Sequence, residues 1–147
     1  MKRFNGAATA LLLSGVLLAS TACTYRLATG ERPEAAEFGL GPRTSAHHTY
    51  KAALQPREPL RLRQMQTVPV RITDAAGRPV AGAEIAIEGG MPEHGHGLPT
   101  QPRVKRALGD GVYEIEGVRF SMGGWWEFKV AIATPAGADV VTFNLDL

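Results

Sequence analysis

The chain has 147 residues, which is enough for one domain with an additional segment but not for two domains. Hydrophobic residues make up 44% of it, so a folded core is expected, and the polarity of the remainder excludes a protein with several membrane spans. The net charge of +2 equals the charge on Lys2 and Arg3, and without them 14 basic residues (16 − 2) face 14 acidic ones. No basic stripe remains, so we expect no nucleic-acid partner.

The N-terminus has the features of a targeting signal. Lys2 and Arg3 precede an apolar run over residues 7–19, and small residues follow up to Ala22. The run is shorter than the roughly 20 residues that a membrane-spanning helix needs, and it is typical of a cleaved secretory signal. Residues 1–22 are therefore predicted to be a signal peptide that directs the protein to the periplasmic side of a bacterial membrane.

Cys23 is the single cysteine, so no intramolecular disulfide is possible. Its place after a small residue at the end of the apolar run resembles a bacterial lipobox, although Ser20 stands where that motif usually has leucine. We expect Cys23 to be lipidated and to anchor the protein to the membrane. The alternative is ordinary cleavage after Ala22, which leaves a soluble periplasmic protein with a free thiol.

Residues 24–49 show no periodicity and mix glycines, prolines and charges of both signs. This composition predicts a tether over residues 23–49 and a folded domain over residues 50–147. His47 and His48 lie near the end of the tether. Adjacent residues in an extended chain point to opposite faces, which favours two solvated linker histidines over a metal-binding pair.

From residue 50 onward, short alternating segments are separated by turn residues, and no segment has a helical period. Pro69 lacks a backbone donor and predicts a bulge or a bare sheet edge near it. About seven strands in just under 100 residues are typical of an immunoglobulin-like sandwich. We therefore predict an all-β, immunoglobulin-like β-sandwich with strands at residues 50–54, 60–74, 80–88, 104–108, 112–118, 126–132 and 141–147.

The segment Asp110-Gly111-Val112-Tyr113 resembles the tyrosine corner of Greek-key sandwiches, in which a tyrosine hydroxyl holds a turn. The alternative interpretation is a half-buried tyrosine without such a bond.

Two glycine-rich segments carry the residues best suited to bind a ligand. Residues 89–99 contain Met91, His94 and His96, and residues 120–126 contain Met122. Thioether and imidazole groups together favour copper, and the soft sulfur favours Cu(I). Gly95 lets both histidine rings turn toward one ion. These four side chains are the predicted metal ligands, and we expect Met122 to lie near the other three.

Three other interpretations stay open at this point. Zinc could bind Glu93 and the two histidines, but the methionines would then be unexplained. The methionines could instead cap the core while the histidines bond carbonyls of their own loop. The glycine-rich loop could also contact a partner without metal, together with Trp125, which is expected to point opposite to Trp126 and either to be exposed or to cover the loop.

Catalysis is not expected from this sequence. The Gly-x-Ser-x-Gly turn of a serine hydrolase does not occur, and the glycines around His94 lack the lysine and helix of a phosphate-binding loop. Acidic residues stand singly on turns and outward faces, which is not the pattern of an acid–base pair.

Four segments together resemble the YtkA-like and FixH-like family. They are Asp-Ala-Ala-Gly-Arg-Pro-Val-Ala-Gly-Ala at residues 74–83, Gly-Gly-Met-Pro-Glu-His-Gly-His-Gly at residues 89–97, Gly-Val-Tyr at residues 111–113 and Phe-Ser-Met-Gly-Gly-Trp at residues 120–125. The resemblance covers residues 50–147. It implies an extracytoplasmic immunoglobulin-like sandwich, and one branch of the family is linked to assembly of copper-containing respiratory oxidases. A copper protein or an oxidase-assembly factor of the envelope is therefore the implied partner. Unlike the membrane-anchored FixH proteins, this chain has no apolar helix after its signal.

Overall fold

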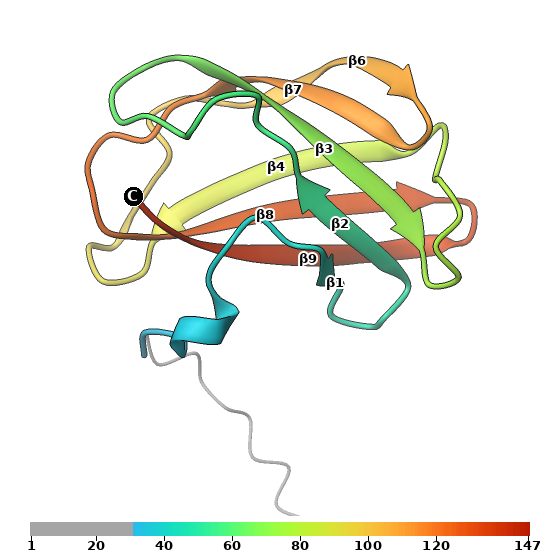
Figure 1. Ribbon diagram of the computed structural model, residues 1–147, viewed down its shortest axis with the longest axis horizontal. Coiled ribbons are helices and arrows are strands. Elements are labelled where there is room, and N and C mark those ends of the chain that lie inside the picture. The colour runs from blue at the N-terminus through green and yellow to red at the C-terminus, as the bar shows by residue number, and fades with distance from the viewer. Residues whose placement is uncertain (1–30) are drawn as a thin grey trace, which may run out of the picture.

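Two antiparallel sheets pack face to face in the computed structural model, which describes residues 31–147 (Figure 1). One sheet has the order β1-β2-β3-β7-β6 and the other has the order β5-β4-β8-β9. The elements in chain order are the 3-10 helix η1 (Ala35–Glu37), β1 (Arg43–Thr44), β2 (Tyr50–Leu54), β3 (Gln66–Asp74), β4 (Glu84–Met91), β5 (His96–Gly97), β6 (Arg103–Gly109), β7 (Val112–Val118), β8 (Trp125–Thr134) and β9 (Gly137–Asp146).

The core lies between the two sheets and follows from the alternation of the strands. Every second residue of β8 is buried, and β9 alternates in the same way. The residues facing inward meet those of β3 and β7 across the interface. The predicted all-β sandwich is confirmed, with its largest fully buried side chains at Trp126, Tyr50, Phe120, Phe128 and Phe143.

The strand positions agree with the sequence pattern where alternation is regular. β2 and β7 have the predicted bounds, whereas β3 begins at Gln66, six residues later than expected. The pairing of β3 with β7 shifts register between Gln66 and Val68, close to Pro69. The irregularity predicted near this proline is therefore present, but β3 is an interior strand between β2 and β7.

The tyrosine corner is also confirmed. The hydroxyl of Tyr113 donates to the carbonyl of Val80 at 2.9 Å and accepts from the backbone N–H of Ala83 at 3.0 Å. Both bonds hold the segment that leads into β4, so one buried hydroxyl fixes the position of the strand that carries Met91.

The structure differs from the predicted tether over residues 35–49. η1 and β1 lie in this segment, and β1 pairs with β2. The backbone N–H of Gly39 donates to Asn144 of β9 at 2.9 Å, and that of Ala46 donates to Val140 at 3.0 Å. These bonds cover polar groups along the edge of β9, which explains why the segment packs on the sandwich. Among the described residues, no helix is long and apolar enough to span a membrane.

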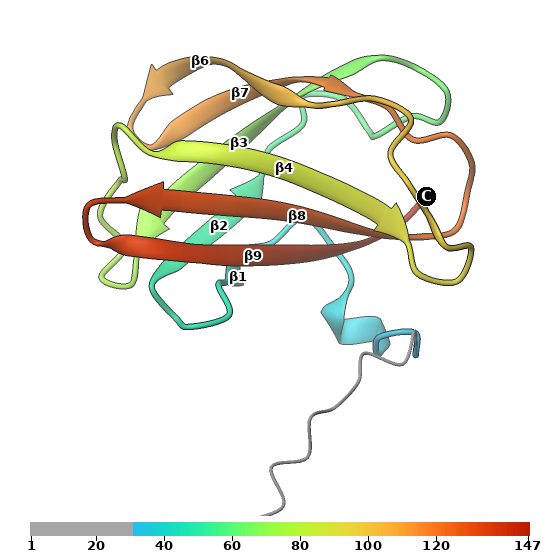
Figure 2. The same ribbon diagram turned by 180° about the vertical axis from the view of Figure 1, so that it is seen from behind.

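The sandwich has two distinct ends, because β4, β8 and β9 all run along its length (Figure 2). At one end β4 finishes at Met91 and β8 begins at Trp125. At the other end lie the start of β4, the turn between β8 and β9, and the turn over residues 45–49 that joins β1 to β2. The predicted ligands all belong to the first end.

Candidate functional site

The predicted histidine loop is a β-hairpin, called here the His hairpin (residues 89–97). β4 continues through Gly89 and Gly90 to Met91, and β5 pairs back with Met91 opposite His96. The carbonyl of Met91 accepts the backbone N–H groups of His94 and Gly95 at 3.0 and 2.9 Å, and Gly95 has φ +67. This tight turn places both histidines on an ordered element.

The pair Gly89-Gly90 looks like the start of a loop in the sequence, but packing explains the first glycine. A Cβ atom at Gly89 would lie 2.9 Å from the Leu98 side chain, so that side chain occupies the space above the strand. A strand that continues through glycine has no periodic signal, and the sequence therefore predicted its end too early.

The two histidine rings of the hairpin lie near one another on an exposed surface. Their centroids are 6.0 Å apart with an angle of 42° between the planes. Nδ1 of His96 lies 3.2 Å from the carbonyl oxygen of Gly97. Because a carbonyl only accepts, Nδ1 carries the proton in this bond, and the lone pair of Nε2 is left for another partner. Metal-binding histidines commonly have their second nitrogen held in this way.

Met91 lies directly across the hairpin from His96. Side chains opposite one another in an antiparallel pair share a face, with Cβ atoms about 4.5–5.5 Å apart. Met91 is only 1% exposed and belongs to the core, and its Cε atom lies 3.0 Å from the position of a Cβ atom at Gly124. Its thioether therefore extends from the hairpin toward the second glycine-rich segment.

Trp126 connects the two glycine-rich segments. Its indole Nε1 donates to the carbonyl of Met122 at 3.0 Å, and its ring meets His96 edge-on with centroids 5.7 Å apart. Met122 is thus joined to this end of the sandwich through its backbone, while its side chain is 37% exposed. His94, His96 and Met91 all lie on the His hairpin, and Met122 lies in the adjoining loop.

Trp125 lies on the face opposite to Trp126, as predicted, but it is not exposed. It is 2% exposed, and its Nε1 donates to the side-chain oxygen of Asn144 at 3.0 Å. The backbone carbonyl of Asn144 also accepts the N–H of Gly39, so the N-terminal segment lies beside the indole on the outer face of the sheet. An interface built on an exposed Trp125 is therefore excluded.

The alternative zinc site, with Glu93 and the two hairpin histidines as ligands, is not formed either. Within residues 31–147, no three His, Cys, Asp or Glu side chains are grouped so that they could hold an ion. Glu93 instead pairs with Arg32, with 3.6 Å between guanidinium and carboxylate. The described residues therefore do not assemble the zinc alternative around Glu93 and the two histidines.

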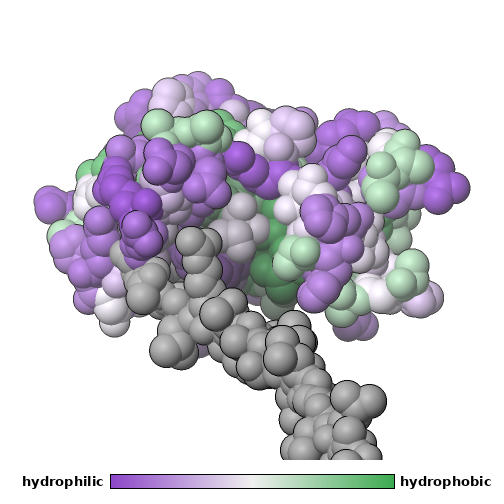
Figure 3. All heavy atoms as spheres, turned by 90° about the horizontal axis from the view of Figure 1, so that it is seen from below, coloured by the Kyte–Doolittle hydropathy of each residue, from purple (hydrophilic) through white to green (hydrophobic). Residues whose placement is uncertain are grey.

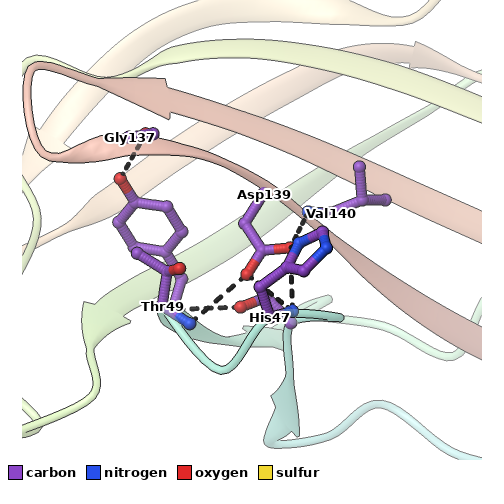
Figure 4. Close-up of polar contacts among 7 residues, drawn as sticks. His47, Thr49, Gly137, Asp139 and Val140 are labelled. Carbon is purple, nitrogen blue, oxygen red and sulfur yellow. Dashed lines mark hydrogen bonds and ion pairs between the residues drawn. The ribbon is translucent and has the colours of Figure 1, made fainter.

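A second polar cluster, the Asp139 cluster, lies at the opposite end of the sandwich (Figure 4). The Asp139 side chain is fully buried and accepts backbone N–H groups from His47, Thr49 and Val140, with donor–acceptor distances of 3.0, 3.3 and 2.8 Å to the nearer oxygen. The ring of His47 contacts the same carboxylate through Nδ1 at 3.1 Å and is otherwise 83% exposed.

The environment of this carboxylate determines its charge. Burial raises the pKa of Asp139, but hydrogen bonds from the Ser45 hydroxyl and from the backbone N–H groups of Val140, Thr49 and His47 lower it more. The net pKa lies well below the usual value, so Asp139 stays ionised. Sequence reasoning missed this cluster, because the separation of 92 residues between His47 and Asp139 leaves no local pattern.

Comparisons with known proteins place the chain in a family. No curated protein and no solved structure matches it. The YtkA-like family matches residues 44–131, which is more than half of the 147 residues and includes the His hairpin, Met122 and Trp126. The match confirms the family predicted from the four motifs and suggests an extracytoplasmic β-sandwich protein. The chain belongs to the YtkA-like family.

Proposed function

We propose that this protein binds copper at the His hairpin and passes it to another protein of the cell envelope. The observation that carries the proposal is the hairpin pair itself: His96 faces Met91 across the two strands, and His94 lies beside it in the turn. Two imidazoles and a thioether on one ordered element form a ligand set of mixed nitrogen and sulfur donors.

The donor chemistry favours copper over harder ions. Calcium and magnesium prefer oxygen ligands, and a structural zinc site usually has four nitrogen, thiolate or carboxylate ligands. Thioether sulfur selects Cu(I), and an imidazole with a free Nε2 suits it as well. Met91 is buried on the hairpin strand opposite His96, and the exposed Met122 supplies a second thioether from the adjoining loop. A cargo ion held near the surface is accessible to a partner.

The proposed location follows from the N-terminus and from the family. The predicted signal over residues 1–22 and Cys23 lie outside the described residues, so lipidation of Cys23 rests on the sequence. We propose a lipid-anchored protein on the periplasmic side of the membrane that acts as a binding and delivery module and not as an enzyme. Radiolabelled palmitate should enter the wild-type protein and be absent from Cys23→Ser.

A Cu(I) titration against a competing chelator tests the copper site. The protein should carry Cys23→Ser throughout, because a free thiol would itself bind Cu(I). We expect one Cu(I) ion to bind with a Kd below about 1 μM, equivalent to about −8 kcal/mol. The double variant His94→Ala/His96→Ala should weaken binding at least about a hundredfold, the equivalent of about 2.7 kcal/mol.

His47→Ala/His48→Ala is the matched control, since it also removes two histidine side chains, but from the other end of the sandwich. It should leave the affinity unchanged. Binding weaker than micromolar in the wild type, or an equal loss in both double variants, would refute the proposal. Affinity should also fall as the pH is lowered, because protons compete with copper for the imidazole nitrogens.

A further inference from the structure

A small cavity lies on the five-stranded sheet, under the loop that connects β2 to β3 (residues 55–65). Figure 1 shows this loop, in green, between the end of β2 and the start of β3. The N–H of Gln55 donates to the carbonyl of Pro69 at 2.8 Å. The side chain of Gln66 accepts the N–H of Arg61 at 2.7 Å and donates to the carbonyl of the same residue at 2.8 Å. These bonds hold the loop over the sheet, and the cavity beneath it has a volume of about 240 Å³.

The cavity is separate from the proposed copper site, because none of its lining residues belongs to the His hairpin or to the loop that carries Met122. It is also unlike the side of the molecule that carries η1 and β1. That side, seen from below in Figure 3, is mostly hydrophilic where it is visible, with hydrophobic residues only toward its middle.

Glu114 is the one buried charged residue in the lining of the cavity. It lies between the core residues Tyr113 and Ile115 and therefore faces outward from β7, yet its side chain is only 9% exposed. Its Oε2 accepts the Nε–H of Arg106 at 2.8 Å, whereas Oε1 has only a contact of 3.5 Å with Nη2 of the same guanidinium. A carboxylate can accept about four hydrogen bonds, and buried polar groups normally have their partners. Oε1 can therefore accept a further donor from the cavity.

We propose that this cavity binds a primary ammonium group on a short aliphatic chain, with the ammonium at Oε1 of Glu114. An ammonium group brings three donors and a positive charge, and its hydrogen bonds to a carboxylate are about twice as strong as those between neutral groups. The apolar part of the lining comes from Pro56, Leu60 and Pro69, which suits a hydrocarbon chain.

The buried carboxylate is the charge that decides which ligand is preferred. Arg57 and Glu58 also line the cavity, but both are exposed and of opposite sign, so their effects largely cancel in water. Arg106 remains bound to Oε2 and is not part of the lining. Because its side chain is 60% exposed, solvent and salt screen its repulsion of a second cation.

The volume of the cavity limits the size of the ligand. Sites for drug-sized molecules span about 300–1,000 Å³, and this cavity is smaller. A free amine such as n-butylammonium is of suitable size. The side chain of a lysine from another protein ends in the same ammonium on a stem of the same length, so it is the second possible source of this group.

Nuclear magnetic resonance of the isotope-labelled, metal-free Cys23→Ser protein tests the site with n-butylammonium as the probe. We expect saturable shifts of the backbone amides of Thr67 and Glu114, with a Kd of about 1 mM for so small a ligand. The uncharged n-butanol and the oppositely charged n-butyrate should bind at least about tenfold more weakly, because neither offers a charged donor to Glu114.

Two variants and a matched control assign the binding to the cavity. Glu114→Gln should weaken binding of n-butylammonium at least about tenfold. Glu116→Gln is the control: Glu116 lies on the same strand and pairs with Arg103 at 2.8 Å, but it does not line the cavity, so binding should be unchanged. The exposed Thr67 lines the cavity, and Thr67→Phe should abolish binding by filling the space while Glu114 stays in place. The dispersion of the amide signals shows whether each variant is folded, and Thr67→Phe tests the site even if Glu114→Gln does not fold.

No saturable shift up to about 10 mM n-butylammonium would refute the site and would mean that water alone fills the cavity. Equal loss in Glu114→Gln and Glu116→Gln, or butyrate or butanol binding as tightly as the amine, would refute the role of the buried carboxylate. The source of the ammonium is distinguished by Nα-acetyl-lysine methylamide. Binding as tight as that of n-butylammonium indicates a lysine of a partner protein, and weaker binding indicates a free amine.

Discussion

Both ends of the sandwich carry histidines, but the hydrogen-bond partners of the ring nitrogens differ between the two ends. At the Asp139 cluster, the ring of His47 and three backbone N–H groups meet one buried carboxylate. In the His hairpin no carboxylate joins the two histidines, and Nε2 of His96 keeps its lone pair. A cluster with its polar groups paired internally stabilises the fold, whereas unpaired nitrogens beside a thioether are available to a ligand.

Asp139→Asn should give the largest loss of stability. The amide that replaces one oxygen is a donor, so it would face backbone N–H groups that now donate to a carboxylate. We expect the Tm to fall further than for any variant below, while Cu(I) affinity stays unchanged. Thermal unfolding followed by circular dichroism measures the first effect, and an unchanged Tm would contradict the structural role of the cluster.

The same group predicts how stability responds to acid. Because the folded pKa of Asp139 is depressed, its contribution is complete above the unfolded pKa of about 3.9 and is lost as the pH falls below that value. The free energy of unfolding of the wild type, measured with urea, should therefore fall steeply below about pH 4. The free energy of unfolding of Asp139→Asn should depend less on pH there. Parallel profiles would show that Asp139 does not titrate as described.

Two variants of Met91, at the other end of the sandwich, distinguish a packing role of this side chain from a role as a copper ligand. Truncation by Met91→Ala leaves a cavity in the core and should cost about 2–5 kcal/mol of unfolding free energy. Met91→Leu keeps the volume and should cost less than about 1.5 kcal/mol. If the thioether is a ligand, Met91→Leu nevertheless loses Cu(I) affinity about tenfold, which corresponds to about 1.4 kcal/mol. Unchanged affinity in this variant would assign Met91 to the core alone.

Tyr113→Phe should have a smaller effect. It removes the hydroxyl that bonds Val80 and Ala83 and should lower the free energy of unfolding by about 1–2 kcal/mol. Since the bonds hold the segment leading into β4, copper affinity should change little. Chemical denaturation measures the loss, and a cost below about 0.5 kcal/mol would mean that the hydroxyl does not hold this segment.

His47→Ala should have the smallest effect of the series. Its ring is 83% exposed, and Asp139 keeps its backbone donors when the ring is removed. We expect a change within about 1 kcal/mol, as for other exposed charged contacts. A larger loss would mean that the ring, and not the backbone around it, holds the cluster together.

The two ends also differ in how many of their structural features can be predicted from the sequence. Alternation within one strand predicted β2, β7 and the inward face of β3, because its period depends on neighbouring residues alone. The motif around Tyr113 predicted its hydroxyl bonds for the same reason. Met91, His94 and His96 stood out because they are close in the chain and end up on one hairpin.

Contacts between distant residues left no such pattern. The bond from His47 to Asp139 joins residues 92 positions apart, and the docking of Gly39 on Asn144 buries Trp125 against expectation. β4 was predicted to end before Gly89, since glycines carry no alternation, yet pairing with β8 continues to Gly90. The long-range partner, which decides each of these features, cannot be read from local composition.

X-ray absorption at the copper edge of the Cu(I)-loaded Cys23→Ser protein identifies the ligand atoms of the bound ion. We expect ligand atoms that include both nitrogen and sulfur, and we expect the sulfur contribution to be lost in Met91→Leu/Met122→Leu. A shell of nitrogen and oxygen alone in the protein with both methionines would contradict a mixed histidine–methionine site at the His hairpin.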